Sequence, residues 1–429
     1  MERCKRMKKV ASPHLSDSIV RPVILGQFGP PTLACIRSWG MQGFPVGMVC
    51  IASKKEPAPA SKYLTDFVTL PSEKLYTPDG IKLINDFLIK FCATGITCVA
   101  ENVACWINDN RGTLPHEVAV WLPPNRTIKD LTSKLNQIEF ARKVGFNVLP
   151  TYLIEKNLEA VRHIPMDHFP LCLRPTDPTT IKPVFKVRLI YSQTELKQFI
   201  DLIKELDQPI IAQPFMNLPN LIVHGARAIC GDNISLQAFL AERKFEGLAL
   251  TVWPTDLDRE LKDKCIAFAN YFNITGSYHF DLMKGKDTDS VYFLEMNGRL
   301  GGTTAKAFAL GYDEPLLVLQ SYGVLPASPE TSNQKPASSN KQLSTFDYRP
   351  KNKIVSSKQA LLKYFYYTVR GRLTPLDYPS EASLVRIAKT VYGFLSYRDD
   401  VFTLRDIKGS MALYFGNLRS KIPARIPST

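Results

Sequence analysis

Oxygen-bearing side chains recur along two neighbouring apolar segments in the second half of the chain. Asp281 lies in the apolar run Ser277–Met283, and Glu295 and Asn297 lie in or directly after the next run, beyond the polar insert Lys284–Ser290. Two such runs around a turn-rich insert predict a β-hairpin. Residues two apart on a strand share a face, so we expect Glu295 and Asn297 to point the same way, about 7 Å apart.

The chemistry of this hairpin depends on how its strands pair. If Asp281 lies opposite Glu295, one face carries two carboxylates, the Asn297 carboxamide and the His279 imidazole, with Arg299 just beyond. These oxygen donors suit a hard cation but are too few to enclose one, so nucleotide phosphates would complete the shell of a Mg²⁺ ion. Taken singly, the residues are ordinary, because a lone Asp is typical of a solvated strand and Asn-Gly of a turn.

The segment FLEMNGRLGGTTAKAFALG resembles the metal-binding signature of ATP-grasp enzymes, the superfamily of biotin carboxylase and D-alanine–D-alanine ligase. That signature is an acidic residue on one strand and Glu-x-Asn-x-Arg on the next. The sequence carries the pattern at Asp281, Glu295, Asn297 and Arg299. The resemblance implies that the first three hold one or two Mg²⁺ ions beside ATP, with Mn²⁺ as an alternative metal.

Other residues of the same stretch gain a role from this resemblance. It implies that Arg299 is catalytic and stabilises the transferring phosphoryl group and the anionic acid. His279 stands where some relatives have an arginine, so it is a second catalytic candidate; a strand histidine without such a role is the alternative. Gly301 and Gly302 allow close backbone approach to a substrate, and they precede a predicted helix, Thr303–Leu310, whose N-terminal N–H groups could meet an anion.

The residues from Asn125 onward are similar to the lid that covers the nucleotide in the family. We expect a helix over Asp130–Val144, closed by Gly145. The resemblance makes Lys134 a phosphate contact, and a solvated helix lysine is the alternative. Arg174 stands where relatives more often have lysine, and it keeps the charge while gaining bidentate reach to phosphate.

The lid loop departs from the family pattern. Relatives often carry a glycine-rich loop whose backbone N–H groups cover the phosphates, whereas residues Thr176–Pro183 contain no glycine. We predict that Lys182 and Lys186 supply charge to the ATP phosphates instead; an exposed loop or a lid that no longer supports catalysis are the alternatives. Arg227 and Lys244 are weaker candidates for binding phosphate or substrate, with surface charge as the other interpretation.

The apolar run Pro209–Met216 is similar to the strand that contacts adenine in the family. We predict ATP contacts at Gln213, Pro214, Phe215 and Met216. The side chain of Gln213 would face the adenine amino group, while the Pro214 carbonyl and the Met216 N–H would imitate base pairing. An edge strand with core Phe and Met side chains is the alternative.

The chain as a whole is expected to be an α/β (α+β) protein with the ATP-grasp fold. Strand–helix–strand spacing over residues 21–124 predicts a Rossmann-like parallel sheet, although no GxGxxG motif is present. We expect the lid at 125–217 and an antiparallel C-terminal lobe with the metal site at 218–326. The remaining segments are a basic disordered leader at 1–20, a linker at 327–343 and a helical basic and aromatic tail at 344–429.

Charge and composition limit the partners. The net charge is +14, but the basic residues are spread out and lie in no nucleic-acid motif, so we expect anionic small-molecule ligands and no nucleic acid. No apolar run approaches the ~20 residues of a membrane span. The tail could still lie on an acidic membrane surface, or pack on the main body or on a second subunit, which leaves a homodimer open. Nine cysteines without metal-ligand spacing fit a reducing, cytoplasmic location.

Together these features predict a ligase that activates a carboxylate with MgATP and then joins it to an amine. Two other functions stay open. One is an ATP-grasp enzyme with a different acceptor, of the carboxylase or kinase type, although the sequence has no Met-Lys-Met biotin attachment motif. The other is a non-catalytic nucleotide-binding scaffold, which the glycine-free lid loop would favour.

Overall fold

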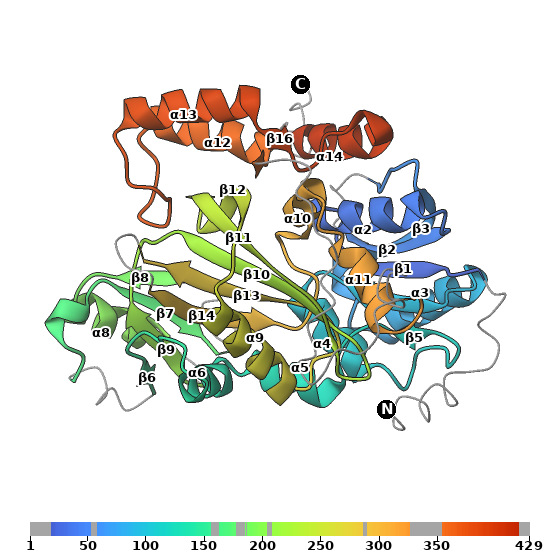
Figure 1. Cartoon of the computed structure of the whole chain (residues 1–429), viewed down its shortest axis with the longest axis horizontal. Coiled ribbons are helices and arrows are strands. Elements are labelled where there is room, and N and C mark those ends of the chain that lie inside the picture. The colour runs from blue at the N-terminus through green and yellow to red at the C-terminus, as the bar shows by residue number, and fades with distance from the viewer. Residues whose placement is uncertain are drawn as a thin grey trace, which may run out of the picture.

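Within the part of the chain that the structure describes, three β-sheets organise the protein (Figure 1). The computed structural model describes residues 19–52, 58–155, 163–176, 185, 187–203, 208–285, 290–326 and 354–419. The predicted leader up to residue 18, the predicted linker, and the candidate residues Lys182 and Lys186 lie outside this described part.

The first sheet is parallel and has five strands. Its elements are β1 (Pro22–Gly26), α2 (Pro30–Met41), β2 (Val46–Ala52), β3 (Leu64–Pro71), α3 (Pro78–Lys90), β4 (Gly95–Cys98), α4 (Glu101–Asp109) and β5 (Ala119–Val120). The strand order is β3-β2-β1-β4-β5, and all neighbours are parallel. The inner strands β1 and β2 are buried along their whole length, as apolar strands are when helices cover both faces of a parallel sheet.

Two helices replace the single helix expected over Asp130–Val144. They are α5 (Asn125–Thr132) and α6 (Lys134–Lys143). The expectation was wrong because Ser133 leaves the helical region, at φ −74° and ψ 95°, and its side chain accepts a hydrogen bond from the Asn136 N–H. A serine in this position caps a new helix. Lys134 is therefore the first residue of α6.

The second sheet is a small antiparallel sheet that lies beyond α6. It consists of β6 (Tyr152–Ile154), β7 (Leu171–Pro175), β8 (Arg188–Ile190) and β9 (Ile210–Pro214), with helix α8 (Gln193–Leu202). The order is β6-β9-β7-β8, so β9 is a central strand. A separate apolar core holds the sheet to α8.

The third sheet has seven strands and carries the predicted hairpin. Its first part is β10 (Asn220–Arg227), β11 (Asn233–Phe245), β12 (Leu248–Thr255), α9 (Arg259–Tyr271), β13 (Gly276–Lys284), β14 (Val291–Asn297), α10 (Thr304–Leu310) and α11 (Glu314–Ser321). Helix α9 packs its apolar side on one face of β10, β13 and β14. The opposite face carries the predicted site residues.

The tail completes this third sheet rather than forming a purely helical segment. It contains β15 (Val355–Ser356), α12 (Lys358–Val369), α13 (Ser383–Ser396), β16 (Arg398–Asp399) and α14 (Ile407–Arg419). The strand order is β14-β13-β10-β11-β12-β15-β16. Leu361 and Tyr364 of α12 pack on Phe245 and Leu250 of the sheet. The tail also reaches the first domain, where Arg37 and Asp406 form a buried ion pair at 2.9 Å.

Candidate active site

The two strands of the predicted hairpin place their polar residues directly opposite one another. In the antiparallel pair β13–β14, Asp281 faces Glu295 and His279 faces Asn297. Cross-strand partners share a face of the sheet, so all four side chains lie on the face opposite α9. A β-bulge follows directly after the Asp281 pair. Two carboxylates and one carboxamide thus meet on a single surface.

Two cations from the lid side converge on Glu295. The Lys134 ammonium lies 3.2 Å from Glu295 Oε2, and the Arg174 guanidinium lies 3.7 Å from the same oxygen. The Asn297 amide donates to the other carboxylate oxygen at 3.4 Å. Burial opposes ionisation of Glu295, but Lys134 and Arg174 outweigh it and lower its pKa to about 2. Glu295 is a carboxylate at every physiological pH.

Asp281 has the opposite electrostatic environment. Burial and, to a smaller extent, repulsion from the facing Glu295 carboxylate together raise its pKa to about 7. The His279 imidazole lies 3.8 Å from the Asp281 carboxylate. Burial, together with the charge of Arg299, holds the pKa of His279 well below its ordinary value. His279 is therefore neutral, and it adds no positive charge to the site.

Gln137 is a residue of this site that the sequence did not reveal. Its side-chain amide donates to the Met296 carbonyl at 3.0 Å, and its side-chain carbonyl accepts from the Met296 N–H at 2.7 Å. This pair of hydrogen bonds fastens α6 to β14 between Glu295 and Asn297. The only signal in the sequence is helical spacing, since Gln137 follows Lys134 by about one turn.

The lid sheet positions Arg174 through Gln213. The Arg174 guanidinium donates to the Gln213 side-chain oxygen at 2.8 Å, and the Gln213 amide donates to the Thr151 hydroxyl at 2.9 Å. Gln213 is buried. Gln213 lies beside Arg174, the predicted phosphate contact, and orients the Arg174 guanidinium. The sequence predicts instead that the Gln213 side chain faces the adenine amino group.

The backbone beyond Gln213 extends past the end of its pairing with β6. The Phe215 N–H donates to the Pro170 carbonyl at 2.7 Å, on the β7 side. Successive residues of an antiparallel strand turn their polar groups to opposite edges, so the Pro214 carbonyl faces the other edge. The neighbouring strand β6 pairs only as far as Ala212 on that edge. Met216 follows in the half-buried segment between β9 and β10.

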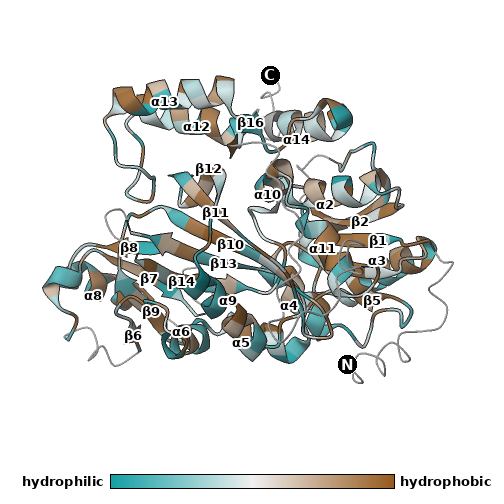
Figure 2. Ribbon diagram, in the orientation of Figure 1, coloured by the Kyte–Doolittle hydropathy of each residue, from teal (hydrophilic) through white to brown (hydrophobic). Residues whose placement is uncertain are grey.

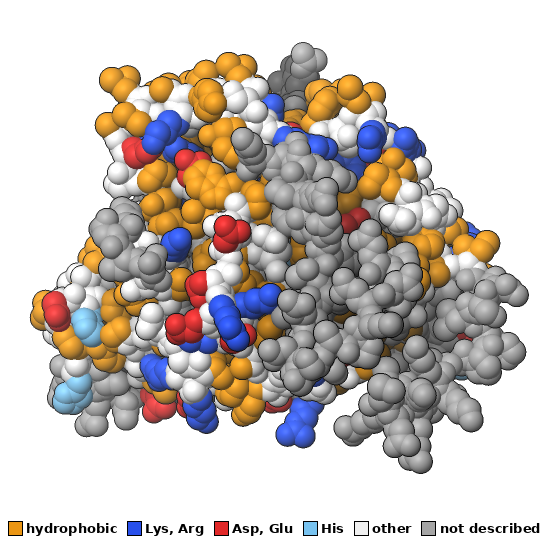
Figure 3. Space-filling model, viewed as in Figure 1, with side chains coloured by type: hydrophobic (Ala, Val, Ile, Leu, Met, Phe, Trp, Pro, Cys, Tyr) orange, Lys and Arg blue, Asp and Glu red, His pale blue; other side chains and the backbone are white. Residues whose placement is uncertain are grey.

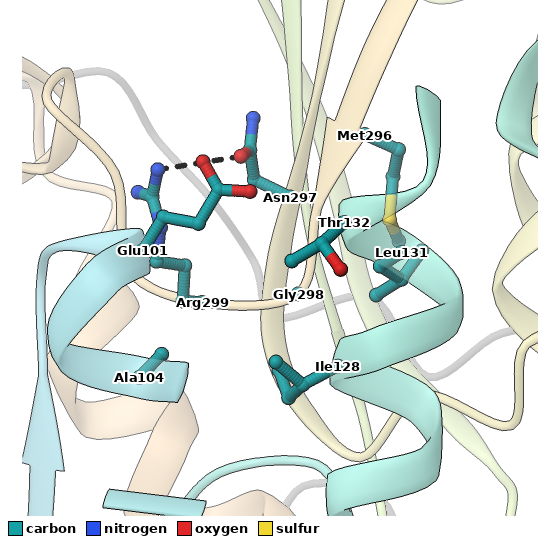
Figure 4. A pocket seen from close by; sticks show the side chains of 9 residues that line it. All are labelled: Glu101, Ala104, Ile128, Leu131, Thr132, Met296, Asn297, Gly298 and Arg299. Atoms are coloured by element: carbon teal, nitrogen blue, oxygen red, sulfur yellow. Dashed lines mark hydrogen bonds between the residues drawn. The ribbon is translucent and has the colours of Figure 1, made fainter. Parts of the chain in front are cut away.

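Arg299 joins the strand pair to the first domain. Its guanidinium donates to Asn297 at 3.3 Å, to the Leu300 carbonyl at 3.0 Å and to the Val99 carbonyl, directly after β4, at 3.3 Å. Its Nε atom is buried and has no hydrogen-bond partner among the described residues. Figure 4 shows Arg299 beside Glu101 and Asn297 around a cavity of about 20 Å³, room for little more than a water molecule.

Solved structures share this arrangement of sheets, although no protein-family model and no curated protein matches the sequence. The ADP complex of N5-carboxyaminoimidazole ribonucleotide synthetase is similar with a TM-score of 0.55 at 11% identity, over 72% of this chain and 78% of that one. L-amino acid ligase from Bacillus licheniformis has a TM-score of 0.52 at 15% identity, over 71% and 74%. Biotin carboxylase from Campylobacter jejuni, in a β-γ-ATP complex, has a TM-score of 0.59 at 14% identity, over 90% and 98%.

All three similar proteins are ATP-grasp enzymes. The chain has the ATP-grasp fold. This confirms the fold class expected from the sequence, with a parallel sheet first and a mainly antiparallel lobe behind the lid. The biotin carboxylase match takes in the largest share of this chain of the three.

The ATP-grasp fold brings only one of the two weaker basic candidates near the strand pair. Arg227 pairs with Gly276, at the far end of β13 from Asp281. Its guanidinium donates to Asn270 at 3.0 Å, to Asn273 at 3.3 Å and to the Ile274 carbonyl at 2.7 Å. The assignment of Arg227 to substrate was wrong, because these bonds commit its charge to the C-terminal end of α9.

Lys244, by contrast, lies at the end of the sheet nearest the lid. Its ammonium donates to Asn220 at 3.3 Å, and Asn220 pairs with Met283, two residues beyond Asp281. Burial lowers the pKa of Lys244 to about 8. The tail packs against this end of the sheet, because the backbone of Tyr378 exchanges hydrogen bonds with the Lys244 backbone at 3.0 and 3.2 Å.

A buried network that the sequence did not reveal holds the Gly301–Thr304 loop. His224 and Glu314 are fully buried and lie 3.1 Å apart. Glu314 accepts a hydrogen bond from the Thr304 hydroxyl at 2.6 Å, and that hydroxyl accepts from the Gly301 N–H at 3.0 Å. His224 and Glu314 are 90 residues apart in the chain, so no local pattern links them. The buried Glu314 and the Thr304 hydroxyl thus fix the conformation of the loop through hydrogen bonds.

Gly301 and Gly302 allow a matched test of this loop. A Cβ at Gly301 would lie 2.4 Å from the His279 ring, whereas a Cβ at Gly302 would meet nothing within 4 Å. We expect Gly301→Ala to cost about 1–3 kcal/mol in the free energy of unfolding and to lower any turnover, because the ring and loop must move apart. Gly302→Ala should stay within about 0.5 kcal/mol of wild type. Urea unfolding of both variants checks this, and equal effects would contradict it.

Proposed function

We propose that the protein is an ATP-dependent ligase that joins a carboxylate to an amine and releases ADP and phosphate. The observation that carries the proposal is the contact of Glu295 with both Lys134 and Arg174, on the face where Glu295 meets Asp281. Carboxylates for a metal and cations for phosphates are thus assembled from two separate lobes. Two of the similar structures are, by their titles, complexes with ADP and with β-γ-ATP, which supports a nucleotide at this place.

The donor set fits Mg²⁺. No group of three His, Cys, Asp or Glu residues within the described part of the chain could hold a metal ion alone. Asp281, Glu295 and Asn297 offer oxygens on one face, which is the partial shell that Mg²⁺ uses when phosphates and waters supply the rest. Bound there, Mg²⁺ would offset the negative charge of the phosphates.

The remaining residues would bind the ATP phosphates and the substrate carboxylate or orient the side chains that do so. Lys134 and Arg174 would contact the phosphates, and Gln213 holds Arg174 in place. Arg299 would receive the carboxylate of the substrate, since its buried Nε has no partner among the described residues. Neutral His279 lies 3.2 Å from the Arg299 carbonyl and positions that segment.

The proposed reaction has two steps. A substrate carboxylate oxygen attacks the γ-phosphorus of ATP, the bond to the bridging oxygen breaks, and ADP leaves an acyl phosphate behind. An amine nitrogen then attacks the acyl carbon, phosphate leaves, and the nitrogen loses a proton to give an amide. Cations positioned around the transferring group stabilise its charge without reorganising.

A second candidate function is a nucleotide-binding scaffold without turnover. The observation in its favour is the absence of glycine from Thr176–Pro183, where relatives often cover the phosphates with backbone N–H groups. An enzyme with a different acceptor, of the carboxylase or kinase type, is a variant of the first proposal, because the carboxylate-activating step can be shared.

The test is a screen of acids and amines with the purified protein, ATP and Mg²⁺. We expect ADP release that requires an acid, and a product of amide mass only when an amine is also present. Hydroxylamine in place of the amine should trap the acyl phosphate as a hydroxamate. Calorimetric binding of MgATP with no turnover across the panels would favour the scaffold and contradict the ligase.

A further inference from the structure

The three tail helices each expose a row of apolar side chains. The rows are Leu362, Tyr366 and Val369 on α12; Leu384, Val391, Tyr392 and Leu395 on α13; and Ile407, Met411 and Phe415 on α14. These side chains are 42% to 80% exposed. Within each row the residues recur at intervals of one, three, four or seven, so each row follows one side of its helix. Figure 3 shows hydrophobic side chains gathered along the edge where α13 and α14 lie in Figure 1.

Helix α13 is the clearest case, because it exposes large apolar side chains although Phe394 packs inward. Its buried residues are the small Thr390 and Gly393, while Leu384 and Leu395 are 80% and 75% exposed. A surface helix ordinarily turns its apolar side inward. Figure 2 shows apolar residues on both α12 and α13, the outermost layer of this side of the molecule. Apolar patches of this kind mark an interaction surface.

The acidic and basic side chains of the tail also differ in their exposure to solvent. Among residues 354–416, every acidic side chain is buried or half-buried. They are Asp377, Glu381, Asp399, Asp400 and Asp406. Asp406 pairs with Arg37, Asp400 with Lys306 at 3.0 Å, and Glu381 with Arg243 at 3.5 Å.

The exposed charges of the same residues are all basic. They are Arg370, Arg372, Lys389, Arg398, Arg405 and Lys408. Three of the acidic residues thus fasten the tail to the body, and the exposed charges beside the apolar rows are basic, with Lys389 also paired to Glu381.

We propose that helices α12, α13 and α14 dock the protein on an anionic membrane surface. Amphipathic helices with Leu, Phe and Tyr on one side and Lys and Arg around them bind at the headgroup boundary, where apolar side chains enter and basic ones meet lipid phosphates. A second copy of the chain suits this surface less well. A symmetric dimer would place the same basic residues opposite one another, with no exposed acid among residues 354–416 to neutralise them.

The experiment is co-sedimentation of the full chain with vesicles of phosphatidylcholine, with and without phosphatidylserine. We expect binding to the phosphatidylserine vesicles that weakens as salt is added. The double variant Leu384→Glu/Leu395→Glu should bind at least about tenfold more weakly, since burial of each leucine contributes at least that factor. Both leucines are highly exposed, so the fold should survive, and circular dichroism checks this.

The controls distinguish binding through this surface from nonspecific adsorption to vesicles. Ile89→Glu changes a side chain that is 63% exposed on α3, in another domain, and should bind as wild type does. Arg370→Glu/Arg372→Glu should weaken binding to phosphatidylserine vesicles at low salt. Wild type that sediments with neither vesicle, or a leucine variant that binds unchanged, would overturn the proposal. A wild-type dimer that the leucine variant dissociates, without lipid binding, would make the surface a self-association interface and likewise overturn it.

Discussion

Replacement of Glu295 by glutamine is expected to lower ATP-dependent turnover at least about a hundredfold while the protein stays folded. The amide keeps the shape of the side chain but removes the charge that a metal ion requires. It also leaves Lys134 and Arg174, at 3.2 and 3.7 Å, without their counter-charge. ADP release measured at saturating Mg²⁺, with an acid and amine pair from the screen, gives the result.

The matched control is Glu260→Gln on α9. Glu260 is 79% exposed in a surface ion pair with Lys264, so its loss should leave turnover unchanged. Thermal unfolding of both variants shows whether the fold is retained. Wild-type activity in Glu295→Gln would remove Glu295 from the metal site and, with it, the proposed role of the strand pair.

Replacement of Asp406 by alanine is expected to destabilise the protein by about 3–5 kcal/mol, because it leaves a buried arginine without its counter-ion. Asp406 accepts hydrogen bonds from Arg37 at 2.9 Å, the Ser61 hydroxyl at 2.8 Å and the Lys62 N–H at 3.0 Å. These bonds join the tail to the first domain. Urea unfolding measures the loss.

Two comparisons make this prediction specific. Asp86→Ala breaks the exposed pair with Lys82 and should cost at most about 1 kcal/mol. The double variant Arg37→Met/Asp406→Leu should be less destabilised than Asp406→Ala, because neither charge is then left buried alone. A small effect of Asp406→Ala would show that the tail is not held by this pair.

The Asp406 contribution should also depend on pH. Burial opposes ionisation of Asp406, but the Lys62 N–H and the Arg37 guanidinium outweigh it and lower its pKa. A carboxyl whose pKa is lower in the folded protein stabilises above its unfolded value of about 3.9, and this stability is lost as the pH falls through the folded pKa. The difference between wild type and Asp406→Ala should therefore be constant from pH 7 to pH 5 and shrink below about pH 4.

Local patterns predicted the hairpin well, because a strand has a period of two. Glu295 and Asn297 must share a face on any strand that contains both, and the turn-rich insert set Asp281 on the partner strand. The same reasoning failed over Asp130–Val144, where one capping serine divided the helix. It also failed at Arg227, whose partners lie more than forty residues away.

By itself, the sequence determined which residues could form a metal and nucleotide site and which face of the strands they share. Tertiary structure decided that Lys134 and Arg174 meet Glu295, that Gln213 orients Arg174, and that the acids of the tail face inward. The physical reason is that alternation and helical spacing act within a few residues. Ion pairs and buried hydrogen bonds between distant segments depend instead on how separate elements pack, and only the folded chain specifies that packing.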